Sequence, residues 1–448
     1  MGGSNRGSVS SMVRVVAAMF VIGVLVAVSG GSASAVPAFR SDASVAVRWF
    51  SLLHDLIRDE KLPPTIASRA IGYAGVTLYE SVVQGMPGHR SLGGQLNELS
   101  ALPVTKPGKN IHWPTAANAA MAVVMRSLFA TAAPGSLAKI DALELELAAL
   151  YVPGLRPGNK LSTLSAAHGK AVGQAIIAWK AGDGFAAAST CPFTPPVGDG
   201  LWVPTPPAFK PALHPCWGDL RTFVLTSGSE CAPPPPPAYS IDPASAFYQE
   251  GREVYDTGVN LTDEQRDIAL FWSDDPALTG TPPGHWVSIV SQLATRDAWS
   301  LDRAAEAYAR VGLGVADAFI ACWDAKFQHN LLRPVTYIQS EIDPNWLPLL
   351  GTPPFAEYTS GHSTQSGAVA ALLTAQLGVV AFTDHTHDAR GLQSRSFHSF
   401  SEAADEAAIS RMYGGIHYRA AIEQGLEQGR CIAGAIHDRV KFLEEDDD

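Results

Sequence analysis

Apolar residues recur every three or four positions along most of the chain, and this spacing predicts amphipathic helices. Between Ser44 and about Ala187 the pattern predicts five helices, at 45–57, 65–83, 115–130, 136–151 and 164–182. We expect these helices to stack as a bundle. Few segments alternate apolar and polar residues as a half-buried strand would, and the chain has no short-period repeat.

Helical patterning returns at Thr262 after a long break. The run TDEQ is typical of a capping box, with Thr262 at the N-cap and Gln265 reaching back to it. Further helices are predicted at 286–298, 301–331, 363–378, 402–413 and 418–443. The sequence therefore predicts an all-α fold of two packed helical bundles, residues 36–190 and residues 244–448.

The segment between the bundles is rich in proline. Residues 191–243 contain 14 of the chain's 32 prolines, including the run Pro233 to Pro237. Proline fixes φ and removes a backbone donor, so the segment is predicted to be irregular and extended. It is either a linker or a long loop over the bundle. We favour the loop, because Trp202, Trp217 and Phe223 offer apolar side chains for packing.

Residues 1–35 have the pattern of a cleavable secretory signal peptide. They contain Arg6 and Arg14, an apolar run over 15–28 and the small-residue end ASA. We expect a secreted protein, periplasmic or extracellular, with an uncleaved N-terminal anchor as the alternative. No later segment is apolar for long enough to span a bilayer, so the processed chain is not expected to be an integral membrane protein.

The net charge limits the kinds of partner that we expect, and the cysteine content indicates which covalent cross-links are possible. Removing residues 1–35 takes away two arginines and no carboxylate, so the net charge goes from −11 to −13, which argues against a nucleic-acid partner. After export, one or two disulfides are expected, first among the three cysteines of the irregular segment. None of the spacings resembles a zinc site. The five cysteines are Cys191, Cys216, Cys231, Cys322 and Cys431.

The first candidate binding residues of the C-terminal half are a pair of cations. Lys326 and Arg333 are seven residues apart, so on one helix they would leave nearly the same face, about 10.5 Å apart along the axis. Pro334 makes Arg333 a predicted helix end, because the residue before proline avoids α geometry. Such a pair alone is most often a solvated cationic face.

The tripeptide Ser360-Gly361-His362 stands where another apolar helix is predicted to begin, with Gly378 at its end. Free N–H groups at a helix N-terminus form a ready anion site. The alternative is an ordinary N-cap followed by a surface histidine.

A Gly-Gly break separates Arg411 from His417, and a further helix is predicted to begin near His417. On one unbroken helix the two side chains would point to different sides, so the break is predicted to turn them toward one point. The alternative is a bare corner with a core histidine. The three segments together offer three cations, helix-end donors and two imidazoles without a carboxylate cluster. This set disfavours a hard divalent cation and fits a tetrahedral oxyanion such as phosphate or vanadate.

In chain order, K-x6-RP, SGH and SR-x5-H resemble the signature shared by the vanadium-dependent haloperoxidases and the type 2 phosphatidic acid phosphatases, over residues 326–417. The resemblance implies an all-α fold with vanadate as cofactor or a phosphate monoester as substrate. It makes His362 the general acid–base, and His417 the ligand of vanadium or the nucleophile toward phosphorus. The residues that it assigns to the oxyanion are Lys326, Arg333, Ser360, Gly361 and Arg411.

The run FWSDDPALTGTPP resembles a segment of the chloroperoxidase-type haloperoxidases in which an aspartate supports the acid–base histidine. Counting from Phe271 selects Asp275, whereas counting back from Pro283 selects Asp274, and both stay open. Trp323 and Phe355 fall where that branch places its halide-pocket aromatics. The resemblance therefore implies oxidation of halide by hydrogen peroxide, with a small organic acceptor.

Two positions depart from the family pattern. Both branches usually carry Asp four residues after the second histidine, where this chain has Ala421, and Thr359 replaces the common proline before SGH. Glu423 is the predicted substitute partner of His417. Two alternatives stay open: a phosphatase acting through phospho-His417, and a non-catalytic oxyanion-binding member, which Ala421 favours.

A separate cluster, DHTHD at 384–388, contains metal-binding residue types. The sequence favours a solvated loop there, with a metal site as a minor hypothesis.

Overall fold

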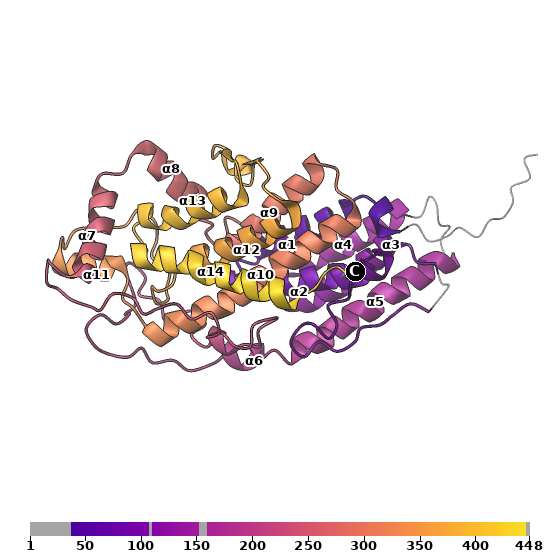
Figure 1. Ribbon diagram of the computed structural model, residues 1–448, viewed down its shortest axis with the longest axis horizontal. Helices are drawn as coiled ribbons and strands as arrows, with labels where there is room; N and C mark the ends of the chain where they lie inside the picture. The colour runs from indigo at the N-terminus through magenta and orange to yellow at the C-terminus, as the bar shows by residue number, and fades with distance from the viewer. Residues whose placement is uncertain (1–36, 107–109, 152–158, 445–448) are drawn as a thin grey trace, which may run out of the picture. The chain divides into compact units, whose positions relative to one another are not determined.

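The computed structural model describes residues 37–106, 110–151 and 159–444, and within them the regular elements are helices except for one short hairpin (Figure 1). The predicted all-α fold is confirmed. The predicted signal peptide, residues 1–35, lies outside the described residues. No helix in the described part is long and apolar enough to cross a membrane.

The five helices predicted for the N-terminal part are present. They are α1 (Ser44–Asp59), α2 (Pro64–Val82), α3 (Trp113–Leu128), α4 (Pro134–Tyr151) and α5 (Lys160–Ala181), followed by the short α6 (Phe185–Ala188). Helix α1 buries one apolar face in the main core cluster, whereas α2 and α3 bury most of their residues in it.

The C-terminal part contains two helices more than the pattern predicted, α7 (Ala246–Val259) and α11 (Pro334–Glu341). Proline begins α11 because its missing N–H costs nothing at the first helical position. The capping box at Thr262 is confirmed by both of its hydrogen bonds. The remaining helices are α8 (Asp263–Phe271), α9 (Thr281–Arg296), α10 (Leu301–His329), α12 (Gly361–Leu377), α13 (Phe400–Tyr413) and α14 (Arg419–Arg439).

Helix α10 is the centre of the packing, with α2 on one side and α12 and α14 on another (Figure 1). The helices approach closely where small residues meet. A Cβ on Gly429 of α14 would lie 2.2 Å from the carbonyl oxygen of Thr364 in α12, so only glycine fits there. This close contact fixes α14 against the helix that begins at the SGH tripeptide.

The Pro-rich segment is a loop packed on the helices, as predicted. Trp202, Trp217 and Phe223 are each at most 2 % exposed. The carboxylate of Asp317, in α10, accepts three backbone hydrogen bonds of 2.6 to 3.0 Å from the segment at Phe223 to Leu225. The loop is therefore anchored to the central helix by both apolar and polar contacts.

Two disulfides are present among the described cysteines. Cys191 pairs with Cys216 inside the loop, as expected, and Cys231 pairs with Cys431 of α14. Cys322 is free and buried. The second bond closes the end of the loop onto the C-terminal helix, a pairing that spacing alone did not indicate.

The described residues form one compact unit, and the predicted boundary between two bundles stays a prediction.

Strands β1 (Phe382–Asp384) and β2 (Arg395–Phe397) pair antiparallel, with Phe382 opposite Phe397. The DHTHD run begins in β1. The predicted solvated loop is wrong for Asp384 and His387, which are buried.

Candidate active site

Lys326 and Arg333 do not share a helix, contrary to the expectation of one continuous face. α10 ends at His329, with Asn330 at φ 46°, and Arg333 is the extended N-cap of α11. Both side chains are buried against one ring, with Lys326 Nζ 5.2 Å and Arg333 Cζ 4.9 Å from the centre of Phe355. A turn, rather than helical periodicity, brings the two cations together.

The ammonium group of Lys326 binds the loop that precedes the SGH tripeptide. It donates to the carbonyl oxygens of Ala356 at 3.1 Å and Glu357 at 2.8 Å, and to that of Thr359. Burial lowers the pKa of Lys326 to about 8. Lys326 therefore fixes the conformation of this loop through its backbone carbonyls and contributes a positive charge next to it.

Arg333 and His417 meet directly. Arg333 donates from Nε to the Phe355 carbonyl at 2.8 Å and from Nη1 to the Ile416 carbonyl at 2.9 Å, and Nη1 lies 3.2 Å from His417 Nε2. Arg411 lies close enough for its charge to act on both groups. Burial is the largest cause of the lowered pKa of Arg333 and of His417, and the charge of Arg411 lowers both further. The predicted convergence of Arg333, Arg411 and His417 on one pocket is present.

The Gly-Gly break produces this convergence. α13 ends at Tyr413, and Gly415 has φ 75°, a left-handed conformation that glycine adopts without strain. Arg411, in the last turn of α13, donates from Nη1 to the Trp272 carbonyl at 2.7 Å. The chain then reverses, and His417 stands two residues before α14 begins.

Glu357 is the carboxylate partner of His417. Its Oε1 lies 2.7 Å from His417 Nδ1 and accepts the Tyr418 N–H at 2.9 Å. The prediction of Glu423 is wrong, because Glu423 is exposed and pairs with Arg419 at 3.5 Å. Burial raises the pKa of Glu357 to about 7, while the charges of Arg333 and Lys326 act against this rise.

A carboxylate three residues before Ser360, in an otherwise uncharged run, is the sequence signal that could have identified Glu357. Glu357, which lies in the loop before α12, takes the place of the aspartate that the family usually carries at the position of Ala421. The loss of one carboxylate from α14 is thus compensated from another segment.

The SGH tripeptide begins α12 as predicted. Ser360 is the N-cap, its Oγ accepting the Ser363 N–H at 3.3 Å, and Gly378 ends the helix. Burial lowers the pKa of His362 well below its usual range, and the charge of Arg411 lowers it further. His362 is therefore a neutral imidazole at the positive end of a helix.

Neither candidate aspartate donates or accepts a hydrogen bond with His362 among the described residues. Asp274 is bound to His285 and paired with His387. Asp275 is exposed as a residue, but its carboxyl group is partly desolvated, which raises its pKa, while the charge of Arg411 acts to lower it. The backbone of Trp272 hydrogen-bonds His362 instead, and it also accepts from Arg411.

The two predicted pocket aromatics are in contact. The rings of Trp323 and Phe355 are 4.8 Å apart, and Trp323 donates to the Leu213 carbonyl at 3.2 Å. A Cβ on Gly361 would lie 3.7 Å from the Trp323 ring. Phe355 therefore lies beside the two cations, and Trp323 lies beside the start of α12.

The pocket fits an oxyanion because two of its buried donor nitrogens, Arg333 Nη2 and Arg411 Nε, have no hydrogen-bond partner in the described part of the chain. His362 Nε2 has no partner either, and in the neutral ring it is an acceptor. A buried donor without a partner costs about 1–3 kcal/mol, and an oxyanion would satisfy both donors at once. Burial lowers the pKa of both Arg333 and Arg411 to about 10, so both remain charged at neutral pH.

Known proteins resemble this chain in sequence and fold. A family model described as the VCPO second helical-bundle domain matches residues 306–445. The crystal structure of a bacterial vanadium-dependent iodoperoxidase is 38 % identical, with a TM-score of 0.83, and covers 90 % of this chain and 98 % of that one. The chain belongs to the vanadium-dependent haloperoxidases.

Two further relatives are more distant. A vanadium chloroperoxidase of Curvularia inaequalis is 32 % identical over 125 residues, 22 % of this chain, so the match spans about a fifth (20 %) of that protein's length. The holo form of a bacterial vanadium-dependent chloroperoxidase shares the fold at 15 % identity, with a TM-score of 0.63 over 86 % of this chain and 93 % of that one. Family membership makes vanadate the cofactor that the pocket is built to hold.

Proposed function

We propose that this haloperoxidase oxidises halide with hydrogen peroxide at vanadate held by His417, with iodide as a substrate. The observation that carries the proposal is the contact between Arg333, His417 and Glu357. The Glu357 carboxylate takes the Nδ1–H of His417 at 2.7 Å, and Arg333 Nη1–H points at Nε2 from 3.2 Å. This pattern fixes the tautomer with the Nε2 lone pair toward the pocket, as a metal-ligating histidine requires.

Vanadate, when bound, supplies a Lewis-acidic centre that activates hydrogen peroxide toward attack by halide. Arg333 and Arg411 hold positive charge around its oxygens, with the helix-end N–H groups of α12 opposite them. Ser360 Oγ and the Gly361 N–H stand at that helix end. The positive pocket is preorganised, because each cation is already fixed by backbone carbonyls.

His362 is suited to accept a proton from hydrogen peroxide. Its pKa lies well below the usual range, so the ring is neutral, and its Nε2 has no protein partner. The Trp272 backbone hydrogen bond holds the ring in place from behind. His362 is therefore the proposed general base, and returning the proton makes it the acid.

Iodide is proposed because the 38 %-identical structural relative is an iodoperoxidase. Trp323 and Phe355 line the pocket on the side of Lys326 and Arg333, where a polarisable halide would meet both aromatic and cationic groups. A small organic acceptor would take the oxidised halide outside this pocket.

We also propose that the protein acts outside the cytoplasm. The signal-like pattern of residues 1–35 supports this, as do two disulfides, which persist in oxidising compartments. Mass spectrometry of the mature N-terminus from culture fluid tests it, with an intact Met1 on cell-retained protein as the contrary result.

The test of the activity uses tag-free protein with orthovanadate, hydrogen peroxide and iodide, bromide or chloride. We expect halide oxidation only when vanadate is added, and none in His417→Ala. His398→Ala is the matched control, since its side chain is 93 % exposed on the hairpin, and it should keep full activity. Hydrolysis of a phosphate monoester that vanadate inhibits, without halide oxidation, would overturn the proposal in favour of a phosphatase.

A further inference from the structure

A second cluster of buried ionisable groups lies behind Trp272. Asp274, His285 and His387 come from the α8–α9 loop, the first turns of α9 and the turn after β1. Their nearest oxygen and nitrogen atoms all lie within 4.8 Å of one another, and all three residues are buried. Asp274 is 2.9 Å from His285 Nδ1 through Oδ2 and 3.2 Å from His387 Nε2 through Oδ1.

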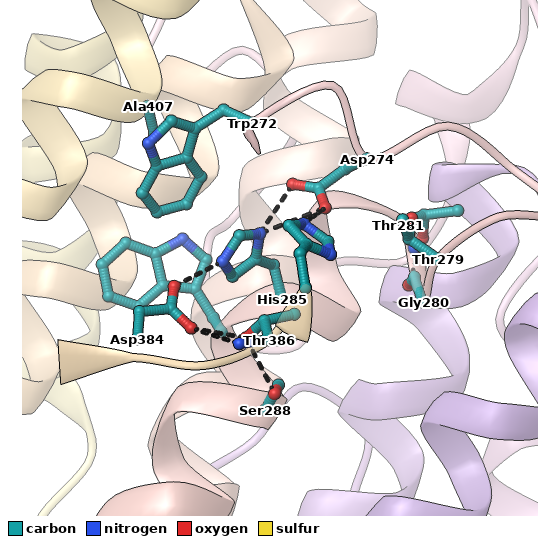
Figure 2. Close-up of polar contacts among 12 residues, drawn as sticks. Trp272, Asp274, Thr279, Gly280, Thr281, His285, Ser288, Asp384, Thr386 and Ala407 are labelled. Carbon is teal, nitrogen blue, oxygen red and sulfur yellow. Dashed lines mark hydrogen bonds and ion pairs between the residues drawn. The ribbon is translucent and has the colours of Figure 1, made fainter. Parts of the chain in front are cut away.

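A second carboxylate orients His285 from the other side. Asp384 Oδ2 lies 2.6 Å from His285 Nε2, so the imidazole stands between the two carboxylates (Figure 2). Asp384 is itself held through Oδ1 by the Thr386 N–H at 2.9 Å and by Gln292 at 3.2 Å. An imidazole with one nitrogen on a carboxylate and the other facing a second ligand set is the arrangement found around protein-bound metals.

His387 supplies an independent sign of a ligand. Its ring is 1 % exposed, yet Nε2 has no well-aligned hydrogen bond, although it lies 3.2 Å from Asp274 Oδ1 and helps to lower the pKa of that carboxyl. Its Nδ1 faces only Arg390 Nη1, at the long distance of 3.5 Å. A buried nitrogen aimed at a carboxylate and a second imidazole, but bonded to neither, is placed to bind an ion.

Two of the three separations, those between Asp274 and each imidazole, match a small ion, and all three groups lie within 4.8 Å of one another. Bonds of about 2.0–2.1 Å to tetrahedrally arranged nitrogen and oxygen atoms put the ligand atoms about 3.3 Å apart. The contacts of Asp274 with the two imidazoles, at 2.9 and 3.2 Å, are close to this value. Two imidazoles and one carboxylate suit zinc and its neighbours, whereas calcium and magnesium prefer oxygen ligands alone.

We propose that Asp274, His285 and His387 bind one divalent transition-metal ion of the zinc class, with Asp384 as the positioning carboxylate. The ion takes the place of the proton on His285 Nδ1, while Nε2–H continues to donate to Asp384. Binding through His387 Nε2 leaves the proton on Nδ1, so the weak Arg390 contact is given up. The site is separate from the vanadate pocket and does not depend on its chemistry.

The position of this site gives it a structural role. Trp272 stacks on His285, with ring centres 4.3 Å apart and planes inclined by 19°, and its carbonyl accepts from Arg411. An ion here joins the 382–397 hairpin to the α8–α9 loop that carries this tryptophan. A cavity of about 960 Å³ lined by Ser288, Gln292 and His385 lies beside the Asp384 segment, since these residues touch or adjoin it.

The test measures metal binding directly. Tag-free protein is stripped with a chelator, incubated with Co²⁺ or Zn²⁺, passed through a desalting column and analysed for metal by mass spectrometry. We expect one equivalent in the wild-type protein, with the visible absorption of Co²⁺ bound by nitrogen and oxygen. His387→Ala and Asp274→Asn should retain at least tenfold less.

His385→Ala is the matched control. His385 lies two positions from His387 in the same run, but its side chain is 54 % exposed and pairs with Asp388, so this variant should keep the full equivalent. His387→Gln gives a second variant of similar size should His387→Ala not fold, and circular dichroism of the metal-free proteins checks folding. A wild-type protein that retains no metal overturns the proposal, as does equal retention by wild type and His387→Ala, or equal loss in His385→Ala.

Discussion

The vanadate pocket and the aspartate–histidine cluster (Asp274, His285, His387 and Asp384) lie on either side of Trp272. They shift the pKa of buried histidine in opposite directions. In the pocket, His362 and His417 face arginines, and their pKa values lie well below the usual range because of burial and then of those positive charges. In the cluster, burial lowers the pKa of His285, but Asp274 and Asp384 outweigh it and raise the pKa to about 10.

The difference shows that the sign of the neighbouring charges, rather than burial, decides what each site attracts. An imidazole among guanidinium groups stays neutral and leaves donors open for an anion. The same ring among carboxylates holds a proton that a metal cation can replace. Neighbouring sites of opposite preference can therefore share one structural wall.

The largest expected effect follows from breaking the cluster. Asp384→Asn removes one of the two carboxylates of His285 and leaves a buried positive charge with a single partner. We expect the free energy of unfolding of the metal-free protein to fall by about 3–5 kcal/mol, measured by urea denaturation. Asp388→Asn, on the exposed side of the same turn, should change it little. An equal loss in the two variants would contradict this account.

A slightly smaller effect is expected from the pocket. Arg411→Ala removes a cation whose Nε has no protein partner, so it should lower kcat for halide oxidation by about 10²–10³-fold at saturating vanadate. Arg430→Ala is the control, because that arginine is paired with Glu427 on the outside of α14. A rate within twofold of wild type in Arg411→Ala would show that the pocket does not use this charge.

Glu357→Gln tests the carboxylate that replaces the missing family aspartate. Glutamine keeps an acceptor for His417 Nδ1 and the Tyr418 N–H but removes the charge. We expect vanadate affinity, from activity titrated against vanadate, to fall by about 10–100-fold. Glu423→Gln should leave it unchanged. The reverse order of effects would restore the partner first predicted from the sequence.

The smallest effect concerns a carboxylate with neutral partners, Glu80, which accepts from the Leu92 N–H and the Ser91 hydroxyl. Burial raises its pKa to about 7. The native state therefore holds a proton that the unfolded chain releases, so stability is full below about pH 4.5 and falls as the pH rises through 7, by at most about 1.4 kcal/mol per pH unit. Glu80→Gln should flatten this slope in thermal melts from pH 4 to 8, and an unchanged slope would contradict it.

Most helices could be predicted because their apolar faces repeat with helical period over more than ten residues. The capping box at Thr262 and the glycine breaks at Gly378 and Gly415 were equally local, and all three are present. α11 was missed because eight residues are too few for a clear period. The end of α10 was misplaced because Asn330 adopts a left-handed conformation, which the proline signal four residues later concealed.

The sequence by itself determined the all-α fold and the residue types of the oxyanion pocket, because both depend on spacing within single segments. Only the tertiary structure decided which carboxylate serves which histidine. Glu357 reaches His417 across 60 residues, and Asp274 turns away from His362 toward His285. Such pairings depend on where loops meet in space, because a hydrogen bond requires atoms about 3 Å apart. The number of residues between two partners does not indicate whether their atoms come this close.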